Sequence, residues 1–259
     1  MNMDFHDNKN KMTYVTREAD ASWHNRMKEI LDIRTIKNAA DIGCGGGIYS
    51  KALIDLGVEN VTAIDSSHSM LEGARENCQH YKAISFQSGT AEKTRMESNS
   101  VDYVLERALI HHIKDLLPSF LEAYRILNNQ GVLLIQDRTP ADCLLPGGSN
   151  HIRGYIFEMF PQLAAIEQKR RHHETDVKVK LEEADFKNVQ IMKLWETRKR
   201  YPTKQQLLME IMQRTGKSIL HELTDLELSQ LTQYIDERLA DYNGVIEEKD
   251  CWTIWTAEK

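Results

Sequence analysis

The segment Asp41-Ile-Gly-Cys-Gly-Gly-Gly47 lies where a short apolar segment gives way to a helix-length one. Glycine has no Cβ, so it lets a backbone turn tightly and approach a ligand closely. A helix that begins at such a turn presents unpaired N–H groups and the positive end of its dipole. Several nucleotide sites share this feature, as do some purely structural turns. The segment therefore indicates a ligand-binding turn but does not by itself identify the ligand.

Short apolar segments alternate with amphipathic, helix-length segments through the first two-thirds of the chain. This alternation is typical of βαβ units around a parallel sheet. The expected strands cover residues 38–42, 60–65, 83–87, 101–106, 132–136, 189–197 and 251–257. The expected helices cover residues 18–34, 47–56, 67–80, 115–127, 151–160, 162–184, 203–215 and 224–241. The predicted fold class is therefore α/β, with a doubly wound, mostly parallel seven-stranded sheet and a helical insertion before the last strand.

Composition narrows the classes of function. The chain has 259 residues, 41% of them hydrophobic, and a formal net charge of -6. Proteins that hold a nucleic-acid backbone usually carry a basic surplus, so this balance favours a small-molecule partner. The four cysteines are scattered without metal-ligand spacing, and no metal site is expected. No signal peptide or membrane-length apolar run is evident, which predicts a cytoplasmic protein.

The residues around the glycine turn separate one nucleotide class from another. A dinucleotide fingerprint requires glycine or alanine where this chain has Ile48 or, in the other register, Ser50. The segment also lacks the G-K-[ST] ending of a phosphate-binding P-loop, so both of these nucleotide classes are excluded. Asp65 ends the next expected strand, about 20 residues on, where a carboxylate can accept hydrogen bonds from both ribose hydroxyls of an adenosine. The alternative is that Asp65 only caps the helix that follows.

Over residues 36–137 the sequence resembles the class I S-adenosylmethionine-dependent methyltransferases. The family's first motif, an acidic residue followed by G-x-G-x-G, is matched by Asp41-Ile-Gly-Cys-Gly-Gly-Gly47, and Asp65 matches its acidic residue after the second strand. Two later motifs are similar to Gly89-Thr-Ala-Glu92 and to residues 100–112. Within the family, the sequence is most similar to small-molecule enzymes of the ubiquinone and menaquinone biosynthesis type. The resemblance implies a Rossmann-like methyltransferase sheet.

The resemblance also implies which residues hold the cofactor S-adenosylmethionine. The turn would lie against the methionine portion, Asp65 would bind the ribose, and Glu106 would pass the methionine amine through its backbone carbonyl. The family usually has aspartate where this chain has Thr90, which accepts a hydrogen bond more weakly. Arg17 would pair with the methionine carboxylate, in a segment that often closes over the cofactor; the alternative is that it is a solvated residue at the start of a helix. The full set of expected cofactor-binding residues is Tyr14, Arg17, Asp41, Gly43, Cys44, Gly45, Asp65, Ser66, Met70, Thr90, Ala91 and Glu106.

Methyl transfer is an in-line displacement that mostly needs positioning, together with a base if the acceptor must lose a proton. His111 follows the fourth strand at the edge where such sheets bind ligands, so it is the candidate general base, ahead of His112. The alternative is that these histidines only pack the loop. Residues 139–150 contain two prolines and two glycines and are expected to form a loop. Substrate contacts are expected from residues 139–160.

These observations predict a domain division of residues 1–34 as an N-terminal segment and cap helix, 35–138 as the cofactor-binding core, and 139–259 as the remainder of the same domain. The predicted function is transfer of a methyl group from S-adenosylmethionine to oxygen or carbon of a small molecule. Two alternatives stay open: an RNA methyltransferase, and a non-catalytic protein that binds S-adenosylmethionine or S-adenosylhomocysteine. The basic runs 169–173 and 198–200 bear on the first of these. Neither the methyl acceptor nor the oligomeric state can be inferred from the sequence.

Overall fold

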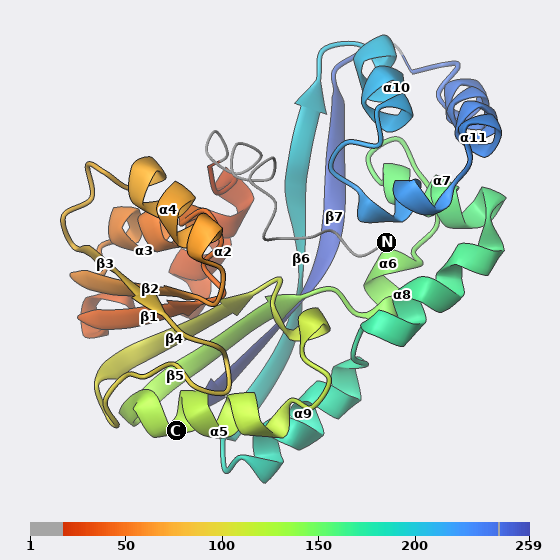
Figure 1. Cartoon of the computed structure of the whole chain (residues 1–259). Helices are drawn as coiled ribbons and strands as arrows, with labels where there is room; N and C mark the ends of the chain where they lie inside the picture. The colour runs from red at the N-terminus through yellow and green to blue at the C-terminus, as the bar shows by residue number, and fades with distance from the viewer. Residues whose placement is uncertain (1–17, 243) are drawn as a thin grey trace. The chain divides into compact units, whose positions relative to one another are not determined.

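The computed structural model describes residues 18–242 and 244–259, shown in Figure 1. These residues divide into two compact units. The core unit comprises residues 18–137, 172–194 and 253–259, and the helix-rich unit comprises 138–171 and 195–252 apart from residue 243. The three-part division expected from the sequence places its boundaries elsewhere and stays a prediction.

A seven-stranded sheet forms the framework within the described residues, in the order β3-β2-β1-β4-β5-β7-β6. The pairs β1–β2, β1–β4, β2–β3 and β4–β5 are parallel, and β7 is antiparallel to β5. The predicted mostly parallel, seven-stranded α/β fold is therefore confirmed. The strands are β1 (Asn38–Ile42), β2 (Asn60–Asp65), β3 (Ile84–Ser88), β4 (Val101–Arg107), β5 (Leu127–Asp137), β6 (Lys187–Tyr201) and β7 (Ile246–Glu258).

Helices cover both faces of the sheet in the core unit. In Figure 1, α3 and α4 lie on one face, and α5 and α9 lie on the other. On the second face, Phe120 of α5 and Leu181 of α9 belong to one buried cluster with Ile42, Val104 and Ile135 of the strands. The helical elements of this unit are α2 (Ala21–Ile30), η2 (Ile33–Thr35), α3 (Ile48–Leu56), α4 (His68–Asn77), η3 (Ile110–His112), α5 (Leu117–Ile126) and α9 (Glu174–Glu183).

Helix α2 is anchored to the sheet by buried apolar side chains and by one hydrogen bond. Asp20 caps the helix by accepting the Ser22 N–H at 3.0 Å, so the helix begins later than expected. Trp23 and Met27 are fully buried. The Trp23 indole N–H donates to the side-chain carbonyl of Gln136 on β5 at 2.9 Å. A buried indole N–H needs such an acceptor, and this bond fixes where α2 packs.

The helix-rich unit has its own apolar core, in which Ile156, Leu207, Ile211, Leu231 and Ile235 are buried together. The number of residues in this core supports a separately packed unit, because each fully buried aliphatic side chain contributes roughly 1.5–3 kcal/mol to the stability of the fold. The helical elements are α6 (Pro140–Cys143), α7 (Ile152–Met159), η4 (Pro161–Leu163), α8 (Ala164–Arg170), α10 (Lys204–Met212), η5 (Ser218–Glu222) and α11 (Asp225–Arg238).

Three local expectations from the sequence are wrong. The loop expected over 139–150 contains α6, because Thr139 and Asp142 form a capping box and Pro140 stands where a helix tolerates proline. The single helix expected over 162–184 is two helices, α8 and α9, separated by residues 171–173. Residues 128–131, which the expected helix 115–127 and strand 132–136 left between them, belong to β5 at a register irregularity opposite β4.

Strands β6 and β7 are longer than the apolar pattern predicted, because polar side chains stabilise their extra length. Arg198 on β6 donates to Glu248 on β7 at 2.5 Å, and Thr197 donates to Glu247 at 3.2 Å. Opposite-charge pairs across neighbouring strands stabilise a sheet without apolar residues. A search for hydrophobic alternation therefore finds only the middle of each strand. Within the described residues, each helix is too short or too polar to span a lipid bilayer.

Candidate active site

The glycine turn joins β1 to α3 and is hydrogen-bonded to the neighbouring strand β2. The N–H groups of Gly43 and Cys44 both donate to the carbonyl of Ile64 on β2, at 2.8 and 3.0 Å. Gly43 has a φ of +74°, and a Cβ there would lie 2.8 Å from the Leu109 side chain. Gly45 has a φ of +51°, and nothing lies within 4 Å of the position its Cβ would take. The turn therefore leaves open space beside Gly45, where a ligand could lie against the backbone.

Asp41 and Cys44 are buried beneath this turn. The Ser50 hydroxyl of α3 donates to the Asp41 carboxyl at 2.6 Å. Burial raises the pKa of Asp41 to about 6, against the lowering effect of that hydrogen bond. Burial also raises the pKa of the Cys44 thiol well above its usual range, which excludes a thiolate nucleophile at neutral pH. Both residues support the turn from inside, and a direct cofactor contact by either stays a prediction.

Asp65 connects the glycine turn to the start of α4. Its Oδ2 accepts the Gly45 N–H at 2.9 Å, and its Oδ1 accepts the Ser67 N–H at 2.8 Å. Ser67, not Asp65, caps α4 through its hydroxyl, so the alternative role of Asp65 as helix cap is wrong. A carboxylate oxygen has more than one acceptor site, so both oxygens can still accept a hydrogen bond from a ligand. Asp65 thus presents two oriented acceptors beside the turn.

A pocket beyond the ends of β2 and β3 is lined in part by Ser66 and Thr90, two of the expected cofactor-binding residues. Thr90 is exposed, and its backbone exchanges hydrogen bonds with Lys93 at 3.1 Å in both directions. Ala91 and Met70 are buried, and their side chains carry no hydrogen-bond donor for a ligand. The pocket is lined by Ser66, Ser88, Gly89, Thr90, Lys93 and Arg95.

Glu106 on β4 is fully buried, and neither of its carboxyl oxygens has a hydrogen-bond partner among the described residues. Burial, together with the charges of Glu92 and Asp137, raises the pKa of Glu106 to about 8. Glu106 was expected from the sequence to act through its backbone carbonyl. The structure instead draws attention to its side chain, because an unsatisfied buried carboxyl is costly and usually has a ligand or a function.

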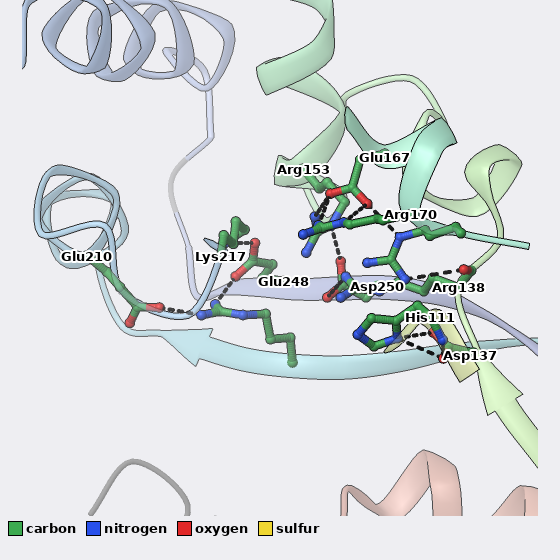
Figure 2. A network of polar contacts seen from close by, with 12 residues as sticks. His111, Asp137, Arg138, Arg153, Glu167, Arg170, Glu210, Lys217, Glu248 and Asp250 are labelled. Atoms are coloured by element: carbon green, nitrogen blue, oxygen red, sulfur yellow. Dashed lines mark hydrogen bonds and ion pairs between the residues drawn. The ribbon is translucent and has the colours of Figure 1, made fainter. Parts of the chain in front are cut away.

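His111 and Asp137 form a pair at the carboxyl ends of β4 and β5, as Figure 2 shows. The His111 Nδ1 lies 2.8 Å from Oδ2 and 3.0 Å from Oδ1 of Asp137, and the His111 backbone N–H also donates to Oδ2 at 3.2 Å. Asp137 is 1% exposed, whereas the His111 side chain is 16% exposed. The carboxylate therefore orients the ring and favours a proton on Nδ1.

The sequence identified His111 but not its partner. Asp137 directly follows the expected strand 132–136. Its position as the last residue of the strand neighbouring β4 was the available signal, because the carboxyl ends of adjacent parallel strands meet at one edge. Two other expected cofactor-binding residues, Tyr14 and Arg17, lie outside the described residues.

Asp102 has a structural role at the opposite ends of the strands. Its Oδ2 accepts the backbone N–H groups of Lys37 and Asn38, each at 3.0 Å, and its Oδ1 accepts the Asn128 amide at 2.8 Å. A second pocket lies here, between residues that include Asp32, Asp102 and Gln130. It contains none of the expected cofactor-binding residues.

Asp102→Ala is expected to lower the free energy of unfolding by about 1 kcal/mol, because three donors lose their acceptor at a partly exposed position. Burial alone would raise the pKa of Asp102, but these donors lower it below 3.8. The contribution is therefore complete above about pH 4 and is lost as the pH falls through the lower folded value. Urea unfolding at pH 7 and pH 3 measures it. A stability loss of equal size at both pH values would contradict this account.

The basic runs of the sequence are ion-paired inside the helix-rich unit (Figure 2). Arg170 and Arg171 both pair with Glu167, and Arg198 and Lys199 both pair with Glu210. Burial opposes the ionisation of Glu210, but these cations hold the pKa of its carboxyl down, at about 2. These ion pairs offset part of the charge of both runs, which weighs against a role for them in binding a phosphate backbone.

The expected substrate segment is also largely internal. His151 and Arg153 are each 3% exposed, and Arg153 donates to Asp250 at 3.1 Å in a pair shared with Arg138. Burial by itself would raise the pKa of the Asp250 carboxyl. The positive charges of Arg153 and Arg138 nevertheless hold that pKa well below its usual range. These residues stabilise the helix-rich unit, and their contact with a substrate stays a prediction.

Comparison with known proteins agrees with the geometry of the core unit. Residues 40–135 match the family model described as "Methyltransferase domain". A protein of 37.1 kDa from a Streptomyces fradiae transposon is 31% identical over 125 residues, which are 47% of this chain and 36% of that protein. The demethylmenaquinone methyltransferase of Staphylococcus aureus strain MRSA252 is 25% identical over 194 residues, covering 68% of this chain and 79% of that enzyme. Matches to this enzyme from other strains span about half of its length, 51%.

Solved structures share the fold at low sequence identity. A candidate methyltransferase from an antibiotic biosynthesis pathway of Anabaena variabilis has a TM-score of 0.68 at 21% identity, covering 92% of this chain and 98% of its own. Phosphoethanolamine N-methyltransferase 2 of Haemonchus contortus, in complex with S-adenosylmethionine, has a TM-score of 0.59 at 18% identity, covering 99% of this chain and 60% of its own. With the glycine turn, Asp65 and the matched family model, these findings show that the chain carries a class I S-adenosylmethionine-dependent methyltransferase domain, whose cofactor is S-adenosylmethionine.

Proposed function

We propose that this protein transfers the methyl group of S-adenosylmethionine to a hydroxyl oxygen or an acidic carbon of a small molecule, with His111 as general base. The observation that carries the proposal is the His111–Asp137 pair at the carboxyl edge of the sheet, where the cofactor-binding residues expected at the ends of β1, β2 and β4 also lie. A methyltransferase that only positions its acceptor has no use for a base oriented by a buried carboxylate.

The residues of the core unit fit the cofactor. Gly45 leaves open space for it, Asp65 has free acceptor sites for the two ribose hydroxyls, and Glu106 offers a buried carboxyl without a protein partner. When bound, S-adenosylmethionine supplies a methyl group on a positively charged sulfur, which makes that carbon electrophilic. What remains for the protein is to orient the acceptor and, where needed, to remove its proton.

His111 is suited to that proton transfer. Ionised Asp137 can only accept hydrogen bonds, so it holds the imidazole proton on Nδ1 and leaves the Nε2 lone pair available. His111 would take the proton of the acceptor hydroxyl through Nε2 as the oxygen attacks. Buried Asp137 would then stabilise the imidazolium that forms.

A small-molecule acceptor is supported by charge and by the relatives. Ion pairs offset part of the charge of the basic runs, and the net charge is -6, and both facts weigh against RNA as the acceptor. The printed names of the matched relatives refer to demethylmenaquinone and to phosphoethanolamine, both small molecules. A hydroxylated aromatic acceptor suits the pair better than an amine, because a base is most useful for an acceptor that must ionise.

Calorimetry with S-adenosylmethionine, S-adenosylhomocysteine and NAD tests whether the protein binds the proposed cofactor. We expect both adenosyl compounds to bind and NAD not to bind, because Ile48 occupies the position where a dinucleotide fingerprint requires a small residue. Transfer of labelled methyl to a panel of phenols, quinols, amines and RNA then tests the proposed class of methyl acceptor. Binding of neither adenosyl compound would refute the proposed function, and labelling of RNA alone would refute the small-molecule acceptor.

A further inference from the structure

The Glu106 carboxyl is an unexplained group in the framework of the sheet. It lies on β4 in register with Ile42 of β1 and Ile135 of β5, so apolar residues flank it on both sides. It is 0% exposed, and within the described residues neither oxygen accepts a hydrogen bond. Protein carboxyls this deeply buried are normally paired, because an unpaired one is destabilising.

No cation of the described residues faces Glu106 to offset this burial. The charged groups that influence it are Glu92, in the loop after β3, and Asp137 on β5, both of which carry the same sign. His111 is engaged with Asp137. Arg107 follows Glu106 on the strand and therefore points to the other face of the sheet, where its guanidinium lies 3.9 Å from the centre of the Tyr49 ring.

We infer that the Glu106 carboxylate is the partner of the α-ammonium group of S-adenosylmethionine, and that it gives up a proton when the cofactor binds. This inference rests on the proposed function. Ile42, in register with Glu106, directly precedes Gly43, so Glu106 lies on the strand next to the turn that is expected to receive the methionine portion. An ammonium has three N–H donors and can satisfy both carboxylate oxygens, whereas the sulfonium of the same cofactor has no N–H donor.

The proton balance of this step is definite. With its pKa raised to about 8 by burial and by the two neighbouring acids, Glu106 is neutral in the free protein at pH 7. The incoming ammonium keeps its own proton, the Glu106 proton passes to the buffer, and a carboxylate–ammonium pair remains. One proton is therefore released for each cofactor bound, and affinity rises with pH up to about 8, where both Glu106 and the ligand amine titrate.

Calorimetry at pH 7.0 in buffers of different ionisation enthalpy measures the number of protons released. For the unaltered chain we expect about one proton from Glu106 with either S-adenosylmethionine or S-adenosylhomocysteine, because both carry the ammonium. Glu106→Gln should release about one proton fewer and bind both ligands about 10–100-fold more weakly at pH 7.5. Its amide has nearly the shape of the carboxyl, and a thermal melt checks that it folds.

Glu92→Gln is the matched control, because it removes a like charge near Glu106 without touching the carboxyl. It should allow Glu106 to ionise at lower pH, so that fewer protons are released at pH 7.0 and the affinity at this pH rises. Equal proton release by the unaltered chain and by Glu106→Gln would overturn the inference. Weaker binding of S-adenosylmethionine alone would also overturn it, by assigning Glu106 to the sulfonium. If the unaltered chain binds neither ligand, it is the proposed function that fails instead.

Discussion

His111→Ala is expected to lower kcat by about 10²–10⁴-fold for an acceptor that must lose a proton, since this is the usual contribution of a general base. The affinity for S-adenosylmethionine should change little, because His111 contacts Asp137 and not the glycine turn. The dependence of the rate on pH should also flatten on its acidic side. Initial rates measured with saturating cofactor between pH 5.5 and 9 test this expectation.

Two further variants separate catalysis from packing. Asp137→Asn keeps the shape of the partner but allows the amide to donate to Nδ1, which moves the imidazole proton to Nε2. It should lower kcat while leaving KM for the cofactor unchanged. His112→Ala is the matched control: its ring lies 4.0 Å from that of His111, but the residue is exposed. If His112→Ala costs as much activity as His111→Ala, or if His111→Ala leaves rate and pH profile unchanged, the base assignment is wrong.

Asp65→Ala is expected to weaken the binding of both S-adenosylmethionine and S-adenosylhomocysteine by roughly 2–4 kcal/mol, or about 30–1,000-fold. Two effects combine in this loss. The ribose hydroxyls lose their charged acceptor, and the N–H groups of Gly45 and Ser67 lose the carboxylate that fixes the glycine turn against α4. Equilibrium binding by calorimetry at pH 7.5 measures it.

Asp102→Ala is the control for Asp65→Ala. It removes an aspartate that also accepts two backbone N–H groups, but at the other end of the strands. It should reduce stability and leave cofactor affinity unchanged. Comparable affinity losses in the two variants would show that Asp65 acts through general loosening of the sheet and not through the cofactor.

Local chemistry accounts for the parts of the site that could be predicted from the sequence. The positions of Gly43 and Gly45 follow from the need for positive φ at a strand-to-helix turn, and both residues have it. Asp65 was recognisable because it ends the strand that neighbours β1. In the same way, His111 was recognisable because it follows the end of β4, where ligands bind in sheets of this kind.

Other features were hidden because they depend on contacts between distant residues. Asp137 lies 26 residues beyond His111, and only the pairing of β4 with β5 brings them together. Glu106 has nothing in its local sequence to show that it lacks a partner, since that depends on Ile42 and Ile135 beside it. The basic runs likewise gave no sign that their cations are paired with Glu167 and Glu210.

By itself, the sequence determined the class of fold and the cofactor-binding turn, because strand and helix periodicity, glycine positions and strand-end residues are local properties of the chain. Tertiary structure alone decided the other features. Polar pairs between strands extended β6 and β7, and a capping box made α6 where proline suggested a loop. Packing against the sheet left the Glu106 carboxyl buried without a protein partner and gave His111 its carboxylate. Whether a side chain is buried, and which group it bonds to, depends on the residues packed around it. Those residues are mostly distant in the sequence and are brought together only by the fold.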